Sequence, residues 1–330
     1  YKYFSGLSVL MLPVVIILLI YTLTQGTIIG GVNASRWISI PIIGVGFQTS
    51  TLASVVLMIY VSRYLARNKE KEINFKESFL YLWAPIGVVL LLILPANFST
   101  TAITFAMVML LVFLGGYPVK YLASILGIGI LALALFVLTV KSFPDSMKNN
   151  RINTWTSRIE NFMSGESEDN YQAEKAKIAL ASGEIYGKGP GKSVQKNFLP
   201  QSSSDFIYAI IGEEFGLIGA ILIILFYLSL LFRIVIIATK IDSIFGTLLV
   251  LGVGLPIVFQ ALINMAVAVG LFPVTGQPLP LISTGGTSIW MTCFAIGIVL
   301  SVSATNENKI IRINKEKLDN PLDILHEAIG

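Results

Sequence analysis

Long apolar runs separated by short polar segments dominate the hydrophobic pattern of this chain. A helix needs about 20 apolar residues to cross the roughly 30 Å hydrocarbon core of a membrane. The pattern therefore predicts an all-α, polytopic integral membrane protein with eight transmembrane helices in this chain. The runs cover residues 5–24, 43–65, 78–95, 98–114, 120–141, 217–237, 245–271 and 286–304.

The composition supports a membrane protein and limits its chemistry. Hydrophobic residues make up 55% of the 330 residues and charged residues 13%, whereas a soluble domain has about 45–50% and about 25%. The one cysteine, Cys293, excludes an intramolecular disulfide framework, and the one histidine, His326, lies in the polar C-terminal tail. Any acid or base is therefore Asp, Glu or Lys. Because the chain begins with Tyr1, we expect a preceding segment.

Lysine and arginine are distributed unequally between the short connections. If the tail at 306–330 is cytoplasmic, thirteen basic residues lie on the inner side, and the opposite short loops hold only Arg36. The positive-inside rule then makes residues 142–216 a large extracytoplasmic loop between the fifth and sixth runs. The inner residues are Lys2, Arg63, Arg67, Lys69, Lys71, Lys76, Lys120, Arg233, Lys240, Lys309, Arg312, Lys315 and Lys317.

The outer loop contains two helical patterns and a glycine-rich segment. Residues 141–162 carry Arg151 and Arg158 beside an apolar stripe, which suits either a helix in the membrane interface or a plain amphipathic surface helix. Residues 170–182 predict a second helix, which ends before Gly183. The following GKGPGKSVQK places three lysines, Lys188, Lys192 and Lys196, around glycines, which fits either a phosphate-binding loop or an ordinary flexible loop.

Asp205 stands at the end of SSSD, immediately before the apolar FIYAII. An aspartate here either caps the following helix or serves as a base. Two carboxylates, Glu213 and Glu214, follow FIYAII and would be costly inside the bilayer. We therefore expect a short helix at the outer surface, with the membrane span starting near Leu217. A candidate base beside a candidate phosphate clamp indicates chemistry on a lipid-linked substrate.

Four ordered blocks resemble the SEDS family of shape, elongation, division and sporulation proteins. They are ASRWISI, RINTWTSRIENF, GKGPGKSVQKNFLPQSSSDFIYAIIGEEFGLIGA and INMAVAVGLFPVTGQPLPLISTGGTS, which begin at residues 34, 151, 187 and 263. The GxGxGxSxQK form, which includes Ser193, is more similar to the FtsW-type cell-division branch than to the RodA-type branch. The resemblance implies a single membrane domain over 1–330, from a fold of about ten transmembrane helices.

The resemblance also implies the activity and the partners. A SEDS protein is a peptidoglycan glycosyltransferase that polymerises the lipid-linked precursor lipid II in the bacterial inner membrane, here at the division septum. It implies a class B penicillin-binding protein and other division proteins as partners, with no nucleic acid. The leaving pyrophosphate needs positive charge or a divalent cation, Mg²⁺ or Mn²⁺, for which the sequence specifies no ligands.

Family motifs assign candidate roles to individual residues. The family's catalytic aspartate matches Asp205, with Ser204 in place of the usual threonine. Arg36 is either a phosphate contact or an interface anchor. The segment around Ser283 is either a rigid turn that caps the last helix or a wall of the substrate cavity. The substrate-binding candidates are Arg36, Arg151, Arg158, Lys188, Lys192, Ser193, Lys196, Glu213, Glu214, Ser283, Gly285 and Gly286.

Four positions depart from the family pattern. Thr51 stands where a glutamate is usual and Ser54 where a lysine is usual. Asn97 replaces an acidic residue, and Gln201 replaces the glutamate that follows LP. Two other classes remain open, a lipid II flippase and a non-catalytic division scaffold. The clustering of ionisable residues at one face favours the enzyme over a transporter.

Overall fold

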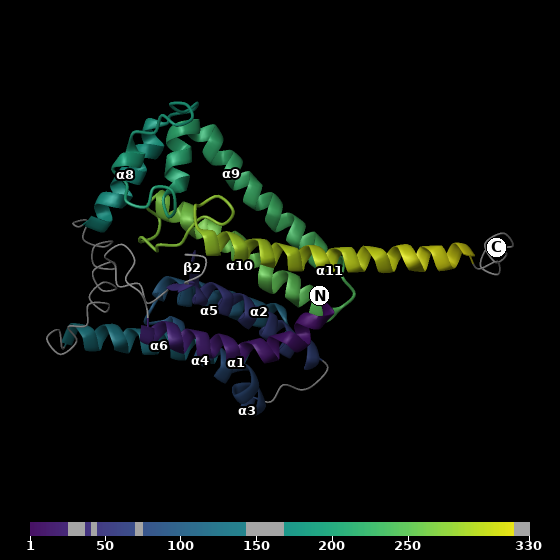
Figure 1. Cartoon of the computed structure of the whole chain (residues 1–330). Coiled ribbons are helices and arrows are strands. Elements are labelled where there is room, and N and C mark those ends of the chain that lie inside the picture. Colours follow the sequence, from purple (N-terminus) through teal and green to yellow (C-terminus); the bar gives the residue numbers. More distant parts are fainter. Residues whose placement is uncertain (26–36, 41–44, 70–74, 143–167, 320–330) are drawn as a thin grey trace.

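The computed structural model describes residues 1–25, 37–40, 45–69, 75–142 and 168–319, and most of these residues are helical (Figure 1). An apolar helix lies in each of the eight predicted runs. The helices are α1 (Lys2–Gln25), α2 (Thr49–Arg67), α3 (Phe75–Ser78), α4 (Ala84–Ile93), α5 (Phe98–Leu114), α6 (Val119–Ser142), α8 (Glu168–Ser182), α9 (Ile207–Lys240), α10 (Ile244–Ala268) and α11 (Gly286–Asp319). Two short turns complete them, the π-helical η1 (Phe79–Trp83) and the 3-10 turn η2 (Gln195–Asn197).

The described helices confirm an all-α, multi-pass membrane protein. Six segments within the described residues are long and apolar enough to cross a membrane, one of them the continuous run Phe75–Ile93 formed by α3, η1 and α4. Two further apolar helices, Phe98–Leu114 and Val119–Leu131, are shorter. Each predicted run thus contains a helix, one run starts later than predicted, and the number of eight crossings stays a prediction.

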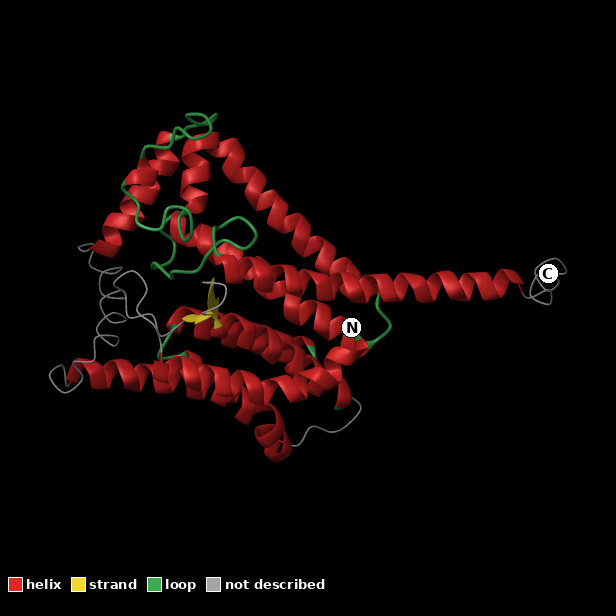
Figure 2. Cartoon of the chain, viewed as in Figure 1, coloured by secondary structure: helices red, strands yellow, loops and turns green. Residues whose placement is uncertain are grey.

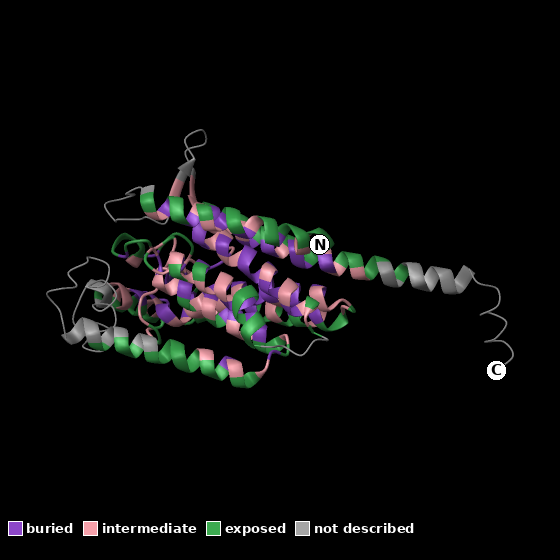
Figure 3. Cartoon of the chain, turned by 90° about the horizontal axis from the view of Figure 1, so that it is seen from below, coloured by how far each residue is buried: buried purple, intermediate pink, exposed green. Residues whose placement is uncertain are grey.

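Helix α10 forms the centre of the bundle and packs against α2, α5, α9 and α11. Gly252 allows its close approach to α2, because an added Cβ would lie 2.9 Å from Ser62 Oγ. That hydroxyl donates a hydrogen bond to the Leu248 carbonyl at 3.0 Å. Figure 3 shows the buried residues where the central helices face one another and exposed residues on the outer faces. In a membrane protein such apolar outer faces contact lipid.

A β-hairpin precedes α2, which the hydrophobic pattern did not predict. Strand β1 (Trp37–Ile40) pairs antiparallel with β2 (Val45–Gln48), with Trp37 opposite Gln48. The predicted start of the second span at residue 43 is therefore wrong, because residues 45–48 are extended and α2 begins at Thr49. Apolar β-branched residues suit a strand as well as a membrane helix. Figure 2 shows the hairpin at the same end of the molecule as the loops before α9 and α11.

Helix α9 consists of two helical parts that meet at Gly216 (Figure 1). Gly216 has φ 66° and ψ −165°, a backbone conformation that interrupts the helix. The prediction that FIYAII forms a short helix separate from a span starting near Leu217 is confirmed by this break. The predicted helix at 170–182 is also confirmed, as α8.

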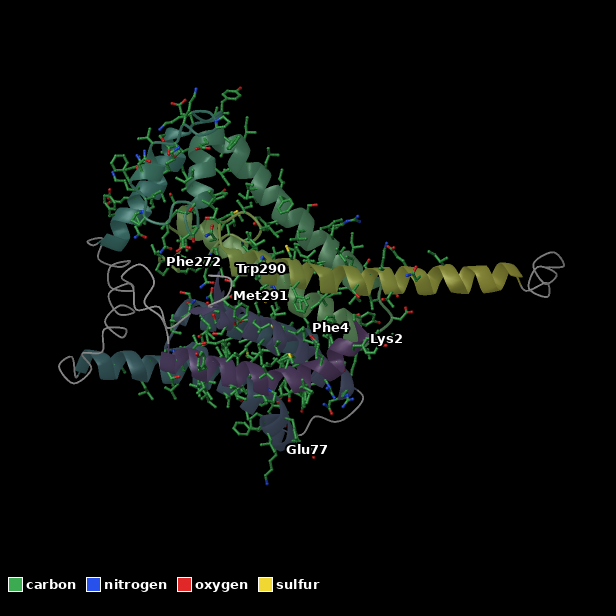
Figure 4. All side chains as sticks on the ribbon, viewed as in Figure 1. Lys2, Phe4, Glu77, Phe272, Trp290 and Met291 are labelled. Carbon is green, nitrogen blue, oxygen red and sulfur yellow. The ribbon has the colours of Figure 1, made fainter. Side chains whose placement is uncertain are left out.

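The two ends of the bundle carry different features. Figure 4 shows Lys2 and Phe272 toward opposite ends of the molecule, with Phe272 in the loop that follows α10. The described elements before α9 and α11 share the Phe272 end, where the sequence places the extracytoplasmic side. The predicted amphipathic helix at 141–162 lies, apart from residues 141–142 of α6, outside the described residues.

Candidate active site

Asp205 lies one residue before Phe206, the N-cap residue of α9. Its main-chain carbonyl accepts a hydrogen bond from Asn264 Nδ2 at 2.7 Å. The same amide nitrogen also donates to the Gln277 carbonyl at 2.7 Å. Because Asn264 belongs to the central helix α10 and is only 1% exposed, it ties the aspartate loop and the loop after α10 to the core.

Two of the three serines before Asp205 are fixed to the segment that precedes α11. The Ser203 carbonyl accepts hydrogen bonds from the Thr284 amide and from Thr284 Oγ1, both at 3.0 Å. The Ser204 carbonyl accepts one from Ser283 Oγ at 2.5 Å. Ser283 is buried between the two loops, and its role as part of a substrate-cavity wall stays a prediction. Gly285 and Gly286 continue this segment into α11.

Asp205 is half-buried. Its Oδ1 accepts a hydrogen bond from Ser204 Oγ at 2.6 Å. Its Oδ2 faces Gly276, where an added Cβ would lie 3.6 Å away. Gly276 has φ +64°, so a glycine suits both the turn and the room beside the carboxylate. Asp205 is thus held by a fixed backbone, and the residue is not fully buried, as a group that exchanges protons with a substrate requires.

Glu213 organises the glycine-rich loop. Its side chain is completely buried and forms an ion pair with Lys188 Nζ at 2.6 Å. Ser193 Oγ donates to Glu213 Oε2 at 2.5 Å. The remaining donors are the Val194 and Gln195 amides at 3.2 Å and 3.1 Å, and Ser182 Oγ at 3.3 Å. Because these donors stabilise the ionised carboxylate, Glu213 fastens the loop to α9.

Glycines allow the same loop to reach the break in α9. Gly187 has φ +79°, and an added Cβ would lie 2.2 Å from the Glu214 carbonyl oxygen. A Cβ on Gly216 would lie 2.3 Å from the Ile185 carbonyl oxygen. The Lys188 amide donates to the Glu213 carbonyl at 3.0 Å, as the close approach requires. Gly187 in the loop and Gly216 at the break in α9 therefore both serve backbone packing.

The other candidate cations of the loop remain accessible. Lys192 and Lys196 are exposed, and Lys196 Nζ donates to the Gly191 carbonyl at 2.9 Å. Glu214 is half-buried, and its Oε1 accepts from the Ser193 amide at 3.4 Å. The structure thus separates two groups, an internal one around Glu213 and an exposed one at Lys192 and Lys196. Arg36, Arg151 and Arg158 lie outside the described residues.

A cavity of about 90 Å³ lies between α2, α5, α10, α11 and the loop after α10. All the described residues that line it are uncharged, and Ser54 Oγ and Thr104 Oγ1 form a hydrogen bond across it at 2.8 Å. Thr51 and Ser54 both line it, so the expected glutamate and lysine are replaced together at one place. Gln277 borders the cavity and connects it, through Asn264, to Asp205.

A third departure from the family pattern belongs to the same region. Asn97 caps α5 by accepting from the Thr100 amide at 3.1 Å. Gln277 Nε2 lies 3.5 Å from Asn97 Oδ1 and 3.0 Å from Thr100 Oγ1. The sequence did not indicate that Asn97, Thr51 and Ser54 converge, because they lie on two different helices. Asn264 and Gln277 were not predicted as site residues, because their contacts also join segments that are far apart in the sequence.

Metal ligands are few around the site. Within the part of the chain that the structure describes, no group of three or more His, Cys, Asp or Glu side chains could hold a metal ion. Mg²⁺ is commonly held by one or two carboxylates together with substrate phosphates. Asp205, a half-buried carboxylate residue, fits such a shared arrangement.

These features define a polytopic membrane protein with a fixed, partly exposed aspartate at one end of its helix bundle. The model of the FtsW, RodA and SpoVE family, described as "Cell cycle protein", matches residues 1–308. The chain belongs to this family.

Relatives and solved structures agree with that assignment. A protein of Escherichia coli O6:H1 named "Probable peptidoglycan glycosyltransferase FtsW" is 34% identical over 310 residues, which cover 91% of this chain and 71% of the relative. A protein of the same name from Geobacter sulfurreducens is 34% identical over 83% of this chain and 72% of its own length.

Two solved structures share the fold. One is described as "Structural coordination of polymerization and crosslinking by a peptidoglycan synthase complex", with a TM-score of 0.71 and 23% identity, over 93% of this chain and 83% of that chain. The other is the rod shape determining protein RodA of Thermus thermophilus, with a TM-score of 0.64 and 22% identity, over 92% and 80%.

Proposed function

We propose that this chain is a peptidoglycan glycosyltransferase that polymerises lipid II, with Asp205 as the general base. The observation that carries the proposal is the geometry of Asp205, whose backbone is fixed from two loops and a central helix while the residue stays half-buried with its Oδ2 facing Gly276. The named activity of relatives at 34% identity supports the reaction class.

The reaction is a displacement at the anomeric carbon of the donor sugar. The acceptor hydroxyl oxygen forms the new glycosidic bond, and the bond from the anomeric carbon to the pyrophosphate breaks with its electron pair on the leaving group. The hydroxyl proton passes to the Asp205 carboxylate. A base fixed in position typically accelerates such a step by about 10²–10⁴.

The leaving pyrophosphate requires positive charge. Lys192 and Lys196 are exposed on the loop that Glu213 fastens to α9, and Arg151 and Arg158 are predicted to join them. A divalent cation held between Asp205 and the pyrophosphate would supply further charge stabilisation. Ser193 and Lys188 contribute by holding the loop, because both bind Glu213.

The neutral cavity favours an enzyme over a transporter. A translocation path typically carries ionisable residues at membrane depth, whereas all the described residues that line the 90 Å³ cavity are uncharged. We further propose that the protein acts in the bacterial inner membrane at the septum, with a class B penicillin-binding protein. The solved complex named for polymerisation and crosslinking supports such a partner.

The test is polymerisation of labelled lipid II by the purified full-length protein together with its penicillin-binding partner. We expect glycan strands whose yield depends on both proteins. Transfer of lipid II between leaflets of a vesicle, without any strand formation, would instead establish a flippase.

A further inference from the structure

A second cavity, of about 410 Å³, lies between α9, α10 and α11, far from Asp205 along these helices. Lys240 and Ile241, at the end of α9, border it, so it lies near the turn that joins α9 to α10. Its walls are mainly apolar. They include Leu230, Ile234, Ile237, Ile257, Val299 and Leu300.

The polar rim of this cavity carries an excess of positive charge. Arg233 and Lys240 line it from α9, and one carboxylate, Glu307, lines it from α11. Ser303 and Asn306 add neutral polar groups, and Asn306 Nδ2 donates to the Lys240 carbonyl at 2.9 Å. Across the described ranges, neither Arg233 nor Lys240 forms an ion pair.

Arg233 is exposed on α9, on the same helix as Lys240. Arg233 precedes Lys240, the last residue of α9, by seven residues, and seven residues of helix span about 10 Å. An exposed arginine about two turns from the helix end can extend its side chain along the helix to the head-group region. A lipid phosphate there would meet both Arg233 and Lys240.

We propose that this cavity binds one anionic phospholipid of the cytoplasmic leaflet. Its phosphate lies between Arg233 and Lys240, its glycerol region meets Ser303 and Asn306, and one acyl chain fills the apolar space. Basic pockets between membrane helices at the cytoplasmic side suit such head groups. The basic residues gathered at this end of the bundle place the site in that leaflet.

The charge at the rim of the cavity favours a lipid over another membrane-spanning helix, because two cations with one carboxylate suit a phosphate head group. Helix α1 does not cover the cavity either. The Tyr1 amino group contacts Ser301 Oγ at 3.3 Å, and Ser301 lies about 200° around α11 from Ser303.

Native mass spectrometry of the purified full-length protein tests the proposal. The protein is equilibrated with nanodiscs of dioleoyl phosphatidylglycerol or of dioleoyl phosphatidylcholine and then released. We expect one retained phosphatidylglycerol per chain and preferential loss of phosphatidylcholine. Arg233→Gln with Lys240→Gln should weaken retention of phosphatidylglycerol about 30-fold, and Lys240→Gln alone about 5-fold.

Two further variants test separately whether lipid retention depends on the cations at the rim and on the apolar space of the cavity. Arg67→Gln removes an exposed cation from the end of α2, outside the cavity, and should leave retention unchanged. Leu300→Trp fills the apolar space and should reduce retention while leaving both cations in place. Equal retention of the two lipids by the unaltered protein, or unchanged retention by both the double variant and Leu300→Trp, would overturn the proposal. If the double variant does not fold, Lys240→Gln and Leu300→Trp decide the matter.

Discussion

Asn264 on α10 donates a hydrogen bond to the main-chain carbonyl of Asp205, at 2.7 Å, although 59 residues separate them in the sequence. Its second bond, to Gln277, joins the loop after α10 to the same point. One buried amide therefore sets the relative position of the aspartate and the loop beside it. Positioning of this kind matters because a displacement of about 1 Å can lower a rate about 10²-fold.

Replacement of Asn264 by alanine should lower the rate of lipid II polymerisation about 10-fold or more, with a smaller change in apparent affinity for lipid II. The loss of both donors also leaves two carbonyls without this partner, at a cost of about 1–3 kcal/mol in stability. Strand yield at saturating lipid II and thermal unfolding measure the two effects.

Asn68→Ala is the matched control, because Asn68 Nδ2 donates to the Tyr64 carbonyl at 2.9 Å at the opposite end of α2 from the site. It should leave polymerisation unchanged. Equal loss of rate in both variants would mean that Asn264 acts only through general stability.

Lys192 and Lys196 should contribute to pyrophosphate binding. Their joint replacement by glutamine removes two exposed cations and should weaken apparent binding of lipid II about 5- to 30-fold. Binding to labelled lipid II in detergent, with Lys69→Gln at the opposite end as control, measures this. Unchanged affinity in the double variant would remove the phosphate role of this loop.

Glu213→Gln should release the glycine-rich loop. Lys188 keeps 35% of its side chain exposed. The loss in free energy of unfolding is therefore expected near the low end for a broken buried ion pair, roughly 2–3 kcal/mol. Thermal unfolding and the rate of limited proteolysis within residues 183–197 report it. Glu214→Gln is a close control, since the described contact of its side chain is a single 3.4 Å bond from the Ser193 amide. Equal proteolysis of the two variants would contradict the anchoring role of Glu213.

Thr51 and Ser54 replace a glutamate and a lysine that are usual in the family. If both charges are restored, the effects on the free energy of unfolding should be coupled between the two positions. They lie one turn apart on α2 and line the same cavity. Thr51→Glu or Ser54→Lys alone introduces a lone charge into this neutral space, at a cost in stability. The double variant should recover about 1–3 kcal/mol relative to the sum of the single changes. A double-mutant cycle in thermal unfolding checks this, and strict additivity would mean that the two side chains do not meet.

Much of the architecture could be predicted from the sequence, because each membrane helix needs a long apolar run. The break at Gly216 was also predictable, since Glu213 and Glu214 are costly within a span. The hairpin was not, because the run from residue 43 to 65 was assigned as a whole to one membrane helix, although the polar residues 48–51 separate the apolar residues of β2 from those of α2.

The site was predictable only in part. The family motif pointed to Asp205, but its supports are tertiary contacts. From the sequence, Asn264 was interpreted only as a polar residue within a span, and Glu213 as a carboxylate near the outer face. The burial of Glu213 depends on how the loop folds over α9, and hydrophobic periodicity gives no signal for that fold.

The replacement of Asp205 by asparagine tests the central claim most directly. Asparagine keeps the size of the side chain and its ability to accept a hydrogen bond, and it cannot take up the proton of the acceptor hydroxyl. The measurement is the yield and length of glycan strands made from labelled lipid II by the purified variant with its partner, with Asp242→Asn as a control in the turn after α9. We predict a loss of about 10²–10⁴ in rate with unchanged thermal unfolding and partner binding. Strands of near-normal length and yield from a folded Asp205→Asn protein would contradict the account.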